Sequence, residues 1–120
     1  MYRIEKEFAF SAAHQLVGLR PDHPCSRLHG HNYRVVVVLE SPTLDGHSFV
    51  VDYNDLAPLK AYIDDQLDHR HLNDALGFQT TAENIARHLF DFCRALWPQT
   101  VEVRVSETPK TWASYREGSA

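Results

Sequence analysis

Three histidines have the spacing expected of metal ligands. His29 and His31 flank Gly30 at the entry to an apolar segment. In an extended strand such residues point to the same face, about 6–7 Å apart along the backbone, so both imidazoles can converge on one ion. His14 follows the first predicted strand, and hairpin-like pairing of that strand with the apolar segment would bring His14 close to the pair. Three neutral imidazoles with an open fourth position form the ligand set of catalytic zinc.

A cysteine in a polar loop shortly before the histidine pair could add a second chemical function. Near a metal and near Arg27, the thiol of Cys25 would ionise more readily and could act as a base or nucleophile. It could also be a fourth metal ligand, which would close the site and make it structural, or a passive loop thiol. The spacing leaves these three interpretations open. Cys93 falls on the apolar stripe of a predicted helix, where a core position is expected.

Two further polar features point to chemistry. Asp68 precedes His69 just after the first predicted helix, and an Asp beside a His can orient or polarise the imidazole, as in catalytic relays. Such residues are also common at a solvated helix end. Farther along, Glu107 continues the alternation of the valines in 101–105, so it points where an apolar side chain is expected. A carboxylate there costs free energy unless it is paired or binds something.

Hydrophobic periodicity predicts the strands that would carry these residues. Residues 3–10 alternate between polar and apolar types, as in a half-buried strand. The run 32–40 contains four consecutive valines, which favour a strand that is apolar on both faces. A return strand, or a continuation of the hairpin, is predicted for 48–51. The final strands are predicted for 101–107 and 112–115.

Two helices are predicted between these strands. The first runs through the helically spaced apolar positions of 56–67, with Asn54 or Asp55 as its cap. The second begins with Thr80 and Glu83 at capping-box spacing. Its apolar stripe consists of Ile85, Leu89, Phe92, Cys93 and Leu96. The order ββααββ predicts an α+β fold, with an antiparallel four-stranded sheet and two helices on one face.

The composition of the chain limits its partners and its setting. The 120 residues include 12 basic and 16 acidic side chains, for a net charge of −4, and we expect one domain over 1–120. Nucleic acid and anionic membranes require clustered positive charge, so neither is expected as the main partner. There is no apolar run of about 18 residues and no stretch typical of a signal peptide, so we expect a cytoplasmic protein.

In this order, the motifs resemble the 6-pyruvoyl-tetrahydropterin synthase family, and most closely its bacterial branch, the 6-carboxy-5,6,7,8-tetrahydropterin synthases of queuosine biosynthesis. The motifs are Phe10–His14, Cys25–Tyr33, Val51–Leu56, Leu67–His69, Thr81–Asn84 and Ser106–Thr108. The resemblance spans nearly the whole chain. It implies the tunnelling fold (T-fold) and a homo-oligomer, a hexamer built as a dimer of trimers. It also implies a zinc ion bound by His14, His29 and His31.

The resemblance further implies a zinc-dependent lyase. Its substrate would be 7,8-dihydroneopterin triphosphate and its product 6-carboxy-5,6,7,8-tetrahydropterin, with release of acetaldehyde and triphosphate. Cys25 would be the general base and not a zinc ligand. Asp68 and His69 would form a relay that reaches the Cys25 of a neighbouring subunit.

Residues that bind the substrate are implied in the same way. Glu107 would anchor the pterin ring through its guanidine-like edge, and this contact would explain a carboxylate on the valine face. Thr81 and Glu83 would lie near it. The triphosphate requires local positive charge, although the chain is acidic overall. The candidate basic residues are Arg20, Arg27 and Lys110.

Three alternatives stay open. A 6-pyruvoyl synthase would eliminate triphosphate without cleaving a carbon–carbon bond. A non-catalytic zinc protein would use Cys25 as its fourth ligand and serve as an assembly module. An aldolase-type relative that cleaves the dihydroneopterin side chain is expected to carry Glu at the position of Cys25, so this sequence argues against it.

Overall fold

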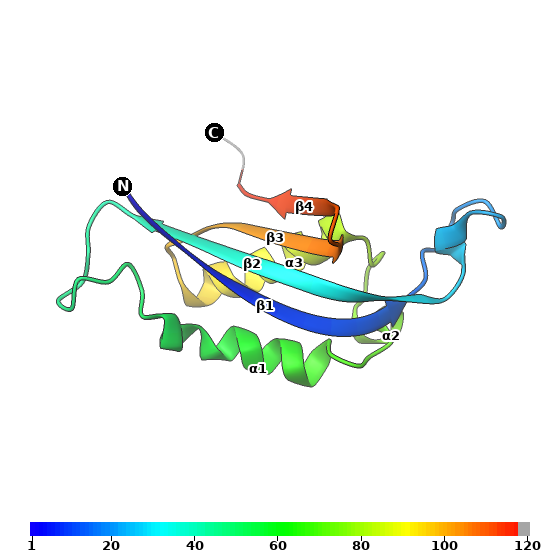
Figure 1. Ribbon diagram of the computed structural model, residues 1–120, viewed down its shortest axis with the longest axis horizontal. Coiled ribbons are helices and arrows are strands. Elements are labelled where there is room, and N and C mark those ends of the chain that lie inside the picture. The colour runs from blue at the N-terminus through cyan, green and yellow to red at the C-terminus, as the bar shows by residue number, and fades with distance from the viewer. Residues whose placement is uncertain (118–120) are drawn as a thin grey trace.

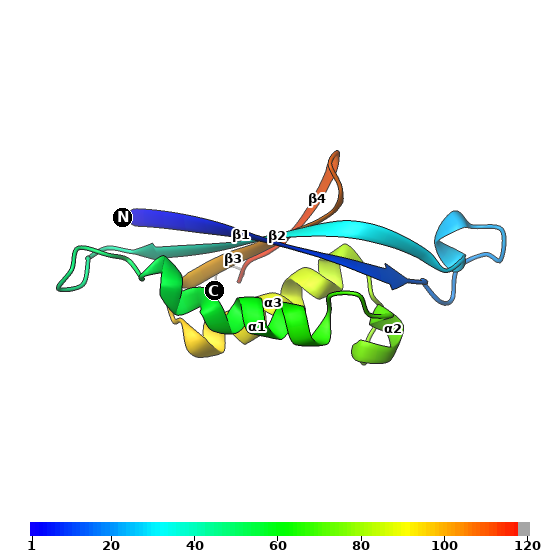
Figure 2. The ribbon, with the colours of Figure 1, turned by 60° about the horizontal axis from the view of Figure 1, so that its bottom comes forward.

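The computed structural model describes residues 1–117 as a four-stranded antiparallel sheet in the order β1-β2-β3-β4, with helices between β2 and β3. The strands are β1 (Tyr2–His14), β2 (His29–Ser41), β3 (Thr100–Thr108) and β4 (Thr111–Tyr115). The α-helices are α1 (Ala57–Gln66), α2 (Leu72–Ala75) and α3 (Ala82–Leu96), and two 3₁₀ helices are η1 (Pro24–Ser26) and η2 (Tyr53–Leu56). Both long helices, α1 and α3, lie on one face of the sheet (Figure 2), which confirms the predicted α+β architecture. None of the helices described within 1–117 is both long and apolar enough to cross a membrane.

The hairpin of β1 and β2 dominates the sheet (Figure 1). Its strands pair from Tyr2 opposite Ser41 to His14 opposite His29. Both strands extend farther than the apolar alternation indicated, so the predicted metal ligands lie within the sheet and not beside it. The loop 15–28, which carries Cys25, projects from this end of the hairpin.

The core lies between the sheet and the helices, and β2 contributes to both faces of the sheet. Val35 and Val37 are fully buried on the face that the helices cover, while Val36 and Val38 are buried on the other face. On that second face their neighbours in β1 and β3 are charged. Ion pairs connect Arg3, Glu5, Glu40, Glu102 and Arg104. The prediction of a strand that is apolar on both faces is therefore confirmed.

The return strand predicted for 48–51 is wrong. The segment belongs to a loop, because the Asp45 carboxylate accepts hydrogen bonds from the backbone N–H groups of His47 (2.8 Å) and Phe49 (3.0 Å). The Asp45 N–H also donates to the Phe49 carbonyl. An Asp that binds backbone groups a few residues ahead favours a turn over a strand.

Both predicted helix caps lie one to three residues from the observed ones. Asp52 caps the short helix η2 by accepting from the Asn54 N–H, in place of the predicted Asn54 or Asp55. Thr81, not Thr80, caps α3 and accepts from the Asn84 N–H. Thr80 is fully buried, and its carbonyl and hydroxyl groups contact the His14 ring.

The helical segments also differ in number and in packing from the prediction. The short helix α2 was not predicted, because four residues carry no usable periodicity. On α3, Leu96 is 49% exposed at the last position of the helix, whereas Ala86 and Phe90 join the buried face. Cys93 is fully buried, as expected for a core residue, and burial raises the pKa of its thiol to about 12.

Candidate active site

The three predicted ligands meet at the end of the β1–β2 hairpin. His14 lies opposite His29 across the two strands, and His31 lies two residues farther along the same face of β2. The ring centroids are 4.6 Å apart for His14 and His29, 5.1 Å for His14 and His31, and 4.8 Å for His29 and His31. One ligand nitrogen from each ring lies within 4.8 Å of the others. Three such nitrogens could hold a metal ion.

Hydrogen bonds to backbone carbonyls determine which nitrogen two of these rings present. The Nδ1 of His14 lies 2.8 Å from the Thr80 carbonyl oxygen, and the Nδ1 of His29 lies 2.7 Å from that of Arg27. A carbonyl oxygen only accepts, so both Nδ1 atoms carry the proton. The Nε2 lone pairs are therefore free for a metal. Carbonyl acceptors behind histidine ligands are typical of metal sites.

Burial favours the neutral form of two of the three rings, His14 and His31. His14 is 1% exposed, and burial is the main cause that lowers its pKa below the ordinary value of 6.5. The pKa of His31 is lowered for the same reason, partly opposed by Glu107. Within the described residues, the Nε2 atoms of His14 and His31 are buried and have no hydrogen-bond partner. Buried imidazoles with unpartnered nitrogens fit a metal ion, which takes neutral imidazole as its ligand.

Cys25 lies in η1, the short 3₁₀ helix of the loop between β1 and β2. Its N–H donates to Nδ1 of His23, and its carbonyl accepts from the Leu16 N–H (2.8 Å). The residue is half-buried. Among the described residues, the group whose ligand atoms converge consists of the three histidines and does not include Cys25. This placement leaves the thiol beside the histidine end of the hairpin, without a position in the ligand set.

The predicted relay is tied to the edge of β1. Asp68 accepts from the Ser11 N–H through Oδ1 (2.9 Å) and contacts His69 Nδ1 through Oδ2 (2.9 Å). These contacts, that from Ser11 first, lower the pKa of the Asp68 carboxyl. His69 has a positive φ of 57° and donates its N–H to the Ser11 carbonyl. Its side chain is 83% exposed, so its far nitrogen faces outward from this subunit.

Glu107 lies close to one of the three histidines. Its Oε2 lies 3.4 Å from Nε2 of His31, without the geometry of a hydrogen bond. It also lines a cavity of about 300 Å³ together with Glu83. Thr81 is occupied as the cap of α3, next to this cavity. The structure thus brings Glu83 and Glu107 together, with Thr81 two residues before Glu83 in the chain.

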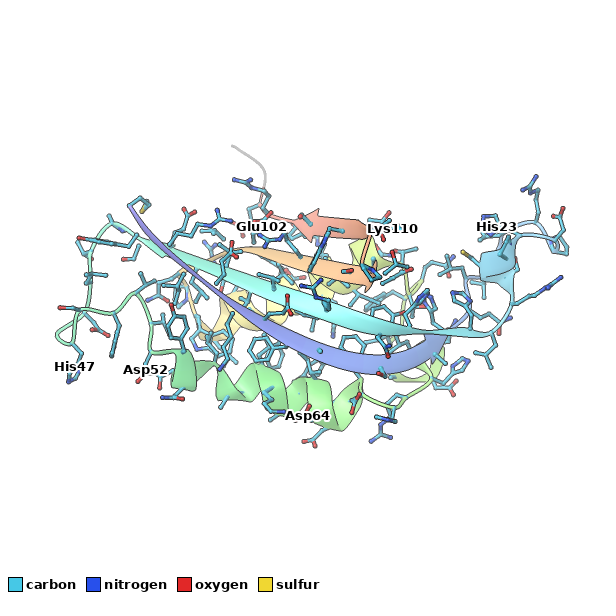
Figure 3. The ribbon with its side chains drawn as sticks, viewed as in Figure 1. His23, His47, Asp52, Asp64, Glu102 and Lys110 are labelled. Carbon is cyan, nitrogen blue, oxygen red and sulfur yellow. The ribbon has the colours of Figure 1, made fainter. Side chains whose placement is uncertain are left out.

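Two larger cavities, of about 550 and 620 Å³, flank the hairpin end and share Ser11, Gly30, His31 and Asn32 in their walls. Their basic lining residues are Arg70 and Arg34, and Arg27 lines neither. Arg27 is exposed, and its carbonyl supports His29. Arg20 pairs with Asp22 at 3.7 Å, and Lys110 is exposed in the turn before β4 (Figure 3).

Several residues at the site were not predicted from the sequence. Thr80 supports His14 through its carbonyl and its hydroxyl. Tyr33 is fully buried beside His31, and its hydroxyl has no partner among the described residues. His23, assigned no role, accepts from the Cys25 N–H, whereas His47 lies at the opposite end of the molecule (Figure 3). Tyr33 could have been predicted at the site, because strand alternation places residues 29, 31 and 33 on the same face.

Comparison with known proteins agrees with this geometry. Residues 3–118 match the family model described as 6-pyruvoyl tetrahydropterin synthase. The chain is 40% identical over 124 residues to the 6-carboxy-5,6,7,8-tetrahydropterin synthase of Synechocystis sp., a match that covers 96% of this chain and 93% of that protein. It is 30% identical over 143 residues to the protein of the same name in Haemophilus influenzae, with 98% and 100% covered.

Solved structures show the same fold. The 6-pyruvoyl tetrahydropterin synthase of Caenorhabditis elegans superimposes with a TM-score of 0.85 at 27% identity, over 98% of this chain and 96% of that one. Because the likeness extends over nearly all of both chains, it includes the hairpin that carries the histidines.

Proposed function

Because the chain belongs to the 6-pyruvoyl tetrahydropterin synthase family, a family of pterin-forming enzymes, we propose that it is a zinc-dependent 6-carboxy-5,6,7,8-tetrahydropterin synthase. The proposed reaction converts 7,8-dihydroneopterin triphosphate and one water molecule to the 6-carboxy product and releases acetaldehyde and triphosphate, as a cytoplasmic step of queuosine biosynthesis. The observation that carries this proposal is the cluster of three converging histidines, two of which have buried nitrogens without a partner among the described residues, with Cys25 outside the cluster. The names of the relatives in Synechocystis and Haemophilus support the carboxy branch.

In this proposal, each residue of the catalytic site has one role. His14, His29 and His31 would hold the metal through their unprotonated nitrogens. Bound there, Zn²⁺ would act as a Lewis acid on the side-chain oxygens of the substrate and make the adjacent C–H bonds more acidic. The Cys25 thiolate would remove a proton, and His69, oriented by Asp68, would carry protons to and from the reacting side chain.

The substrate would be held by its two ends. Glu107 would accept two N–H donors from the guanidine-like edge of the pterin, because a carboxylate matches two parallel donors. Glu83 shares a cavity with Glu107 and Thr81 lies beside it, so both would act at the same end. Arg27 would contribute positive charge toward the triphosphate.

We also propose that the chain acts as one domain over 1–120, in a homo-oligomer that the family resemblance places at a dimer of trimers. The outward-facing His69 supports this arrangement, because a relay exposed on one subunit can serve the thiol of the next. Sharing of residues between subunits makes assembly a condition for activity.

Replacement of Cys25 by Ala separates the proposed lyase from a structural zinc protein. Because Cys25 is outside the histidine cluster, we expect the variant to fold and keep its zinc while turnover falls by about 10²-fold or more. His29→Ala is the matched control and should lose zinc. Zinc loss in the Cys25 variant, or sulfur in the metal's first shell by X-ray absorption, would instead favour the structural alternative.

A further inference from the structure

Beyond the end of β1, two side-chain amides take the place of a neighbouring strand. The Asn73 side chain accepts from the Gln15 N–H (2.9 Å) and donates to the Gln15 carbonyl (2.7 Å). The Gln79 side chain does the same for Val17, at 3.1 and 2.8 Å. A primary amide offers the donor and acceptor of a peptide group, so each satisfies both backbone groups of one residue. We call these two side chains the amide clamps.

The residue between the clamped positions is bonded to the loop that carries the thiol. Backbone groups of successive residues in an extended chain point to opposite sides. Accordingly, Leu16 faces away from the clamps, and its N–H donates to the Cys25 carbonyl (2.8 Å). The Gln15 side chain adds a bond to the Ser26 carbonyl (3.1 Å). Residues 15–17 therefore connect the clamps on one side with η1 on the other.

The same clamped edge continues along the proposed relay and the metal ligand. His69 donates to the Ser11 carbonyl, and the Ala13 N–H donates to the Arg70 carbonyl. The four contacts thus engage alternate residues along one edge, which are Ser11, Ala13, Gln15 and Val17. Thr80, which follows Gln79, holds the His14 ring. One segment, residues 68–80, therefore contains the relay, holds the metal ligand His14 and binds the residues that are bonded to the thiol loop.

We propose that Asn73 and Gln79 are positioning residues that hold the Cys25 thiol at its working place relative to the three histidines. The catalytic part of this inference rests on the proposed function, whereas the mechanical part does not need it. Neither side chain is within the histidine cluster, so their effect on chemistry passes through the backbone of residues 15–17 and the Leu16–Cys25 bond.

The test compares Asn73→Leu, Gln79→Leu and the double variant with wild type in the zinc-loaded full chain. Leucine has nearly the size of these amides but no polar atoms. Asn54→Leu is the matched control, because Asn54 lies near the opposite end of the hairpin and its side chain makes no hydrogen bond to the described residues. Asn73→Asp and Gln79→Glu keep the size of the side chain and the acceptor for the backbone N–H, but they replace the donor to the Gln15 and Val17 carbonyls with a charged oxygen.

Three measurements report on the loop. Hydrogen exchange at the Leu16 amide should accelerate about tenfold or more in the double variant, because its bond to Cys25 is released. Alkylation of Cys25 should become several-fold faster. Cys93 is fully buried and serves as an unreactive internal reference. With zinc content unchanged, kcat should fall about tenfold or more while KM changes little, since a misplaced base slows chemistry without weakening substrate binding.

Unchanged Leu16 exchange and unchanged Cys25 alkylation in the double variant would overturn the inference. Loosening of the loop with an unaltered kcat would also overturn the positioning role. If wild type itself does not convert the pterin, the proposed function fails, and the exchange and alkylation data still decide whether the clamps hold the loop.

Discussion

At the scale of residues, backbone carbonyl groups orient two of the imidazoles by accepting hydrogen bonds from Nδ1, on the side of the ring away from Nε2. The carbonyls of Thr80 and Arg27 fix the protonated nitrogen of His14 and His29, and burial keeps His14 and His31 neutral. A site built in this way need not change tautomer or lose a proton when a metal arrives. The fold itself therefore supplies part of the selectivity for a cation that prefers neutral nitrogen ligands.

The unpartnered hydroxyl of Tyr33 gives a prediction about stability. A buried polar group without a partner destabilises the folded state, so Tyr33→Phe should raise the free energy of unfolding of the metal-free protein by about 1 kcal/mol. Chemical denaturation of chelator-treated protein measures this. Tyr62→Phe is the control, because the Tyr62 hydroxyl bonds to His88 and its loss should destabilise. A less stable Tyr33 variant would contradict the prediction.

Spacing in the sequence identified the ligands but not what supports them. Alternation along a strand sufficed to place His29 and His31 on one face, and hairpin pairing brought His14 to them. The partner of His14 could not be found in this way, because Thr80 is 66 residues distant in the chain and contributes mainly through a backbone carbonyl. Every residue has a backbone carbonyl, so the residue type does not show which carbonyl binds a histidine.

At the scale of elements, α1 and α3 are joined by a hydrogen bond that involves a histidine. The Tyr62 hydroxyl on α1 and Nε2 of His88 on α3 are hydrogen-bonded (2.5 Å). Phe78 and Phe92 pack around this pair. Burial lowers the pKa of His88, with Asp91 acting in the opposite direction. His88 therefore belongs to the contact between the two long helices.

The lowered pKa of His88 predicts a loss of stability in acid. The unfolded chain binds the proton near the ordinary pKa of 6.5, whereas the folded chain resists it, so the stabilisation is present above that value and is lost as the pH falls. His88→Gln keeps an acceptor for Tyr62 but does not titrate. Between about pH 7.5 and about pH 5.5, wild type should lose more unfolding free energy than this variant. Equal losses would contradict the prediction.

Elements with strong periodicity were predicted well, and those fixed by single contacts were not. The valines predict the strands β2 and β3, and the apolar stripe predicts the helix α3, from the sequence alone. The segment 48–51 looked like a strand because its apolar Phe49 and Val50 do not reveal that Asp45 holds a turn. Thr80 and Thr81 offer the same cap in adjacent positions, and only burial of Thr80 separates them.

At the scale of the whole molecule, the proposed reaction depends on assembly. The chain spans 55 × 32 × 26 Å, with the histidines and the Cys25 loop at one end of the long hairpin (Figure 1). The net charge of −4 is opposite to what a triphosphate requires. Positive charge must therefore be concentrated locally, and Arg34 and Arg70 line the cavities beside the site, whereas Arg27 lines neither.

Mixing of two inactive variants tests whether the relay and the thiol come from different subunits. Cys25→Ala and His69→Ala should each be inactive. Refolded together in equal amounts, they should recover about a quarter of wild-type activity, because random assembly pairs an intact Cys25 with a neighbour's intact His69 at about that frequency. Different affinity tags on the two variants, with co-purification through one tag, confirm that mixed oligomers form. No recovery in such oligomers would mean that both groups act within one subunit.

The most direct test of the central claim is the product formed from 7,8-dihydroneopterin triphosphate by the zinc-loaded protein, identified by mass spectrometry with and without a chelator. The account predicts 6-carboxy-5,6,7,8-tetrahydropterin with acetaldehyde and triphosphate, lost on chelation and restored by Zn²⁺. A 6-pyruvoyl product without acetaldehyde would contradict the assignment to the carboxy branch. An unaltered substrate in the presence of zinc-loaded oligomer would contradict the proposed function as a whole.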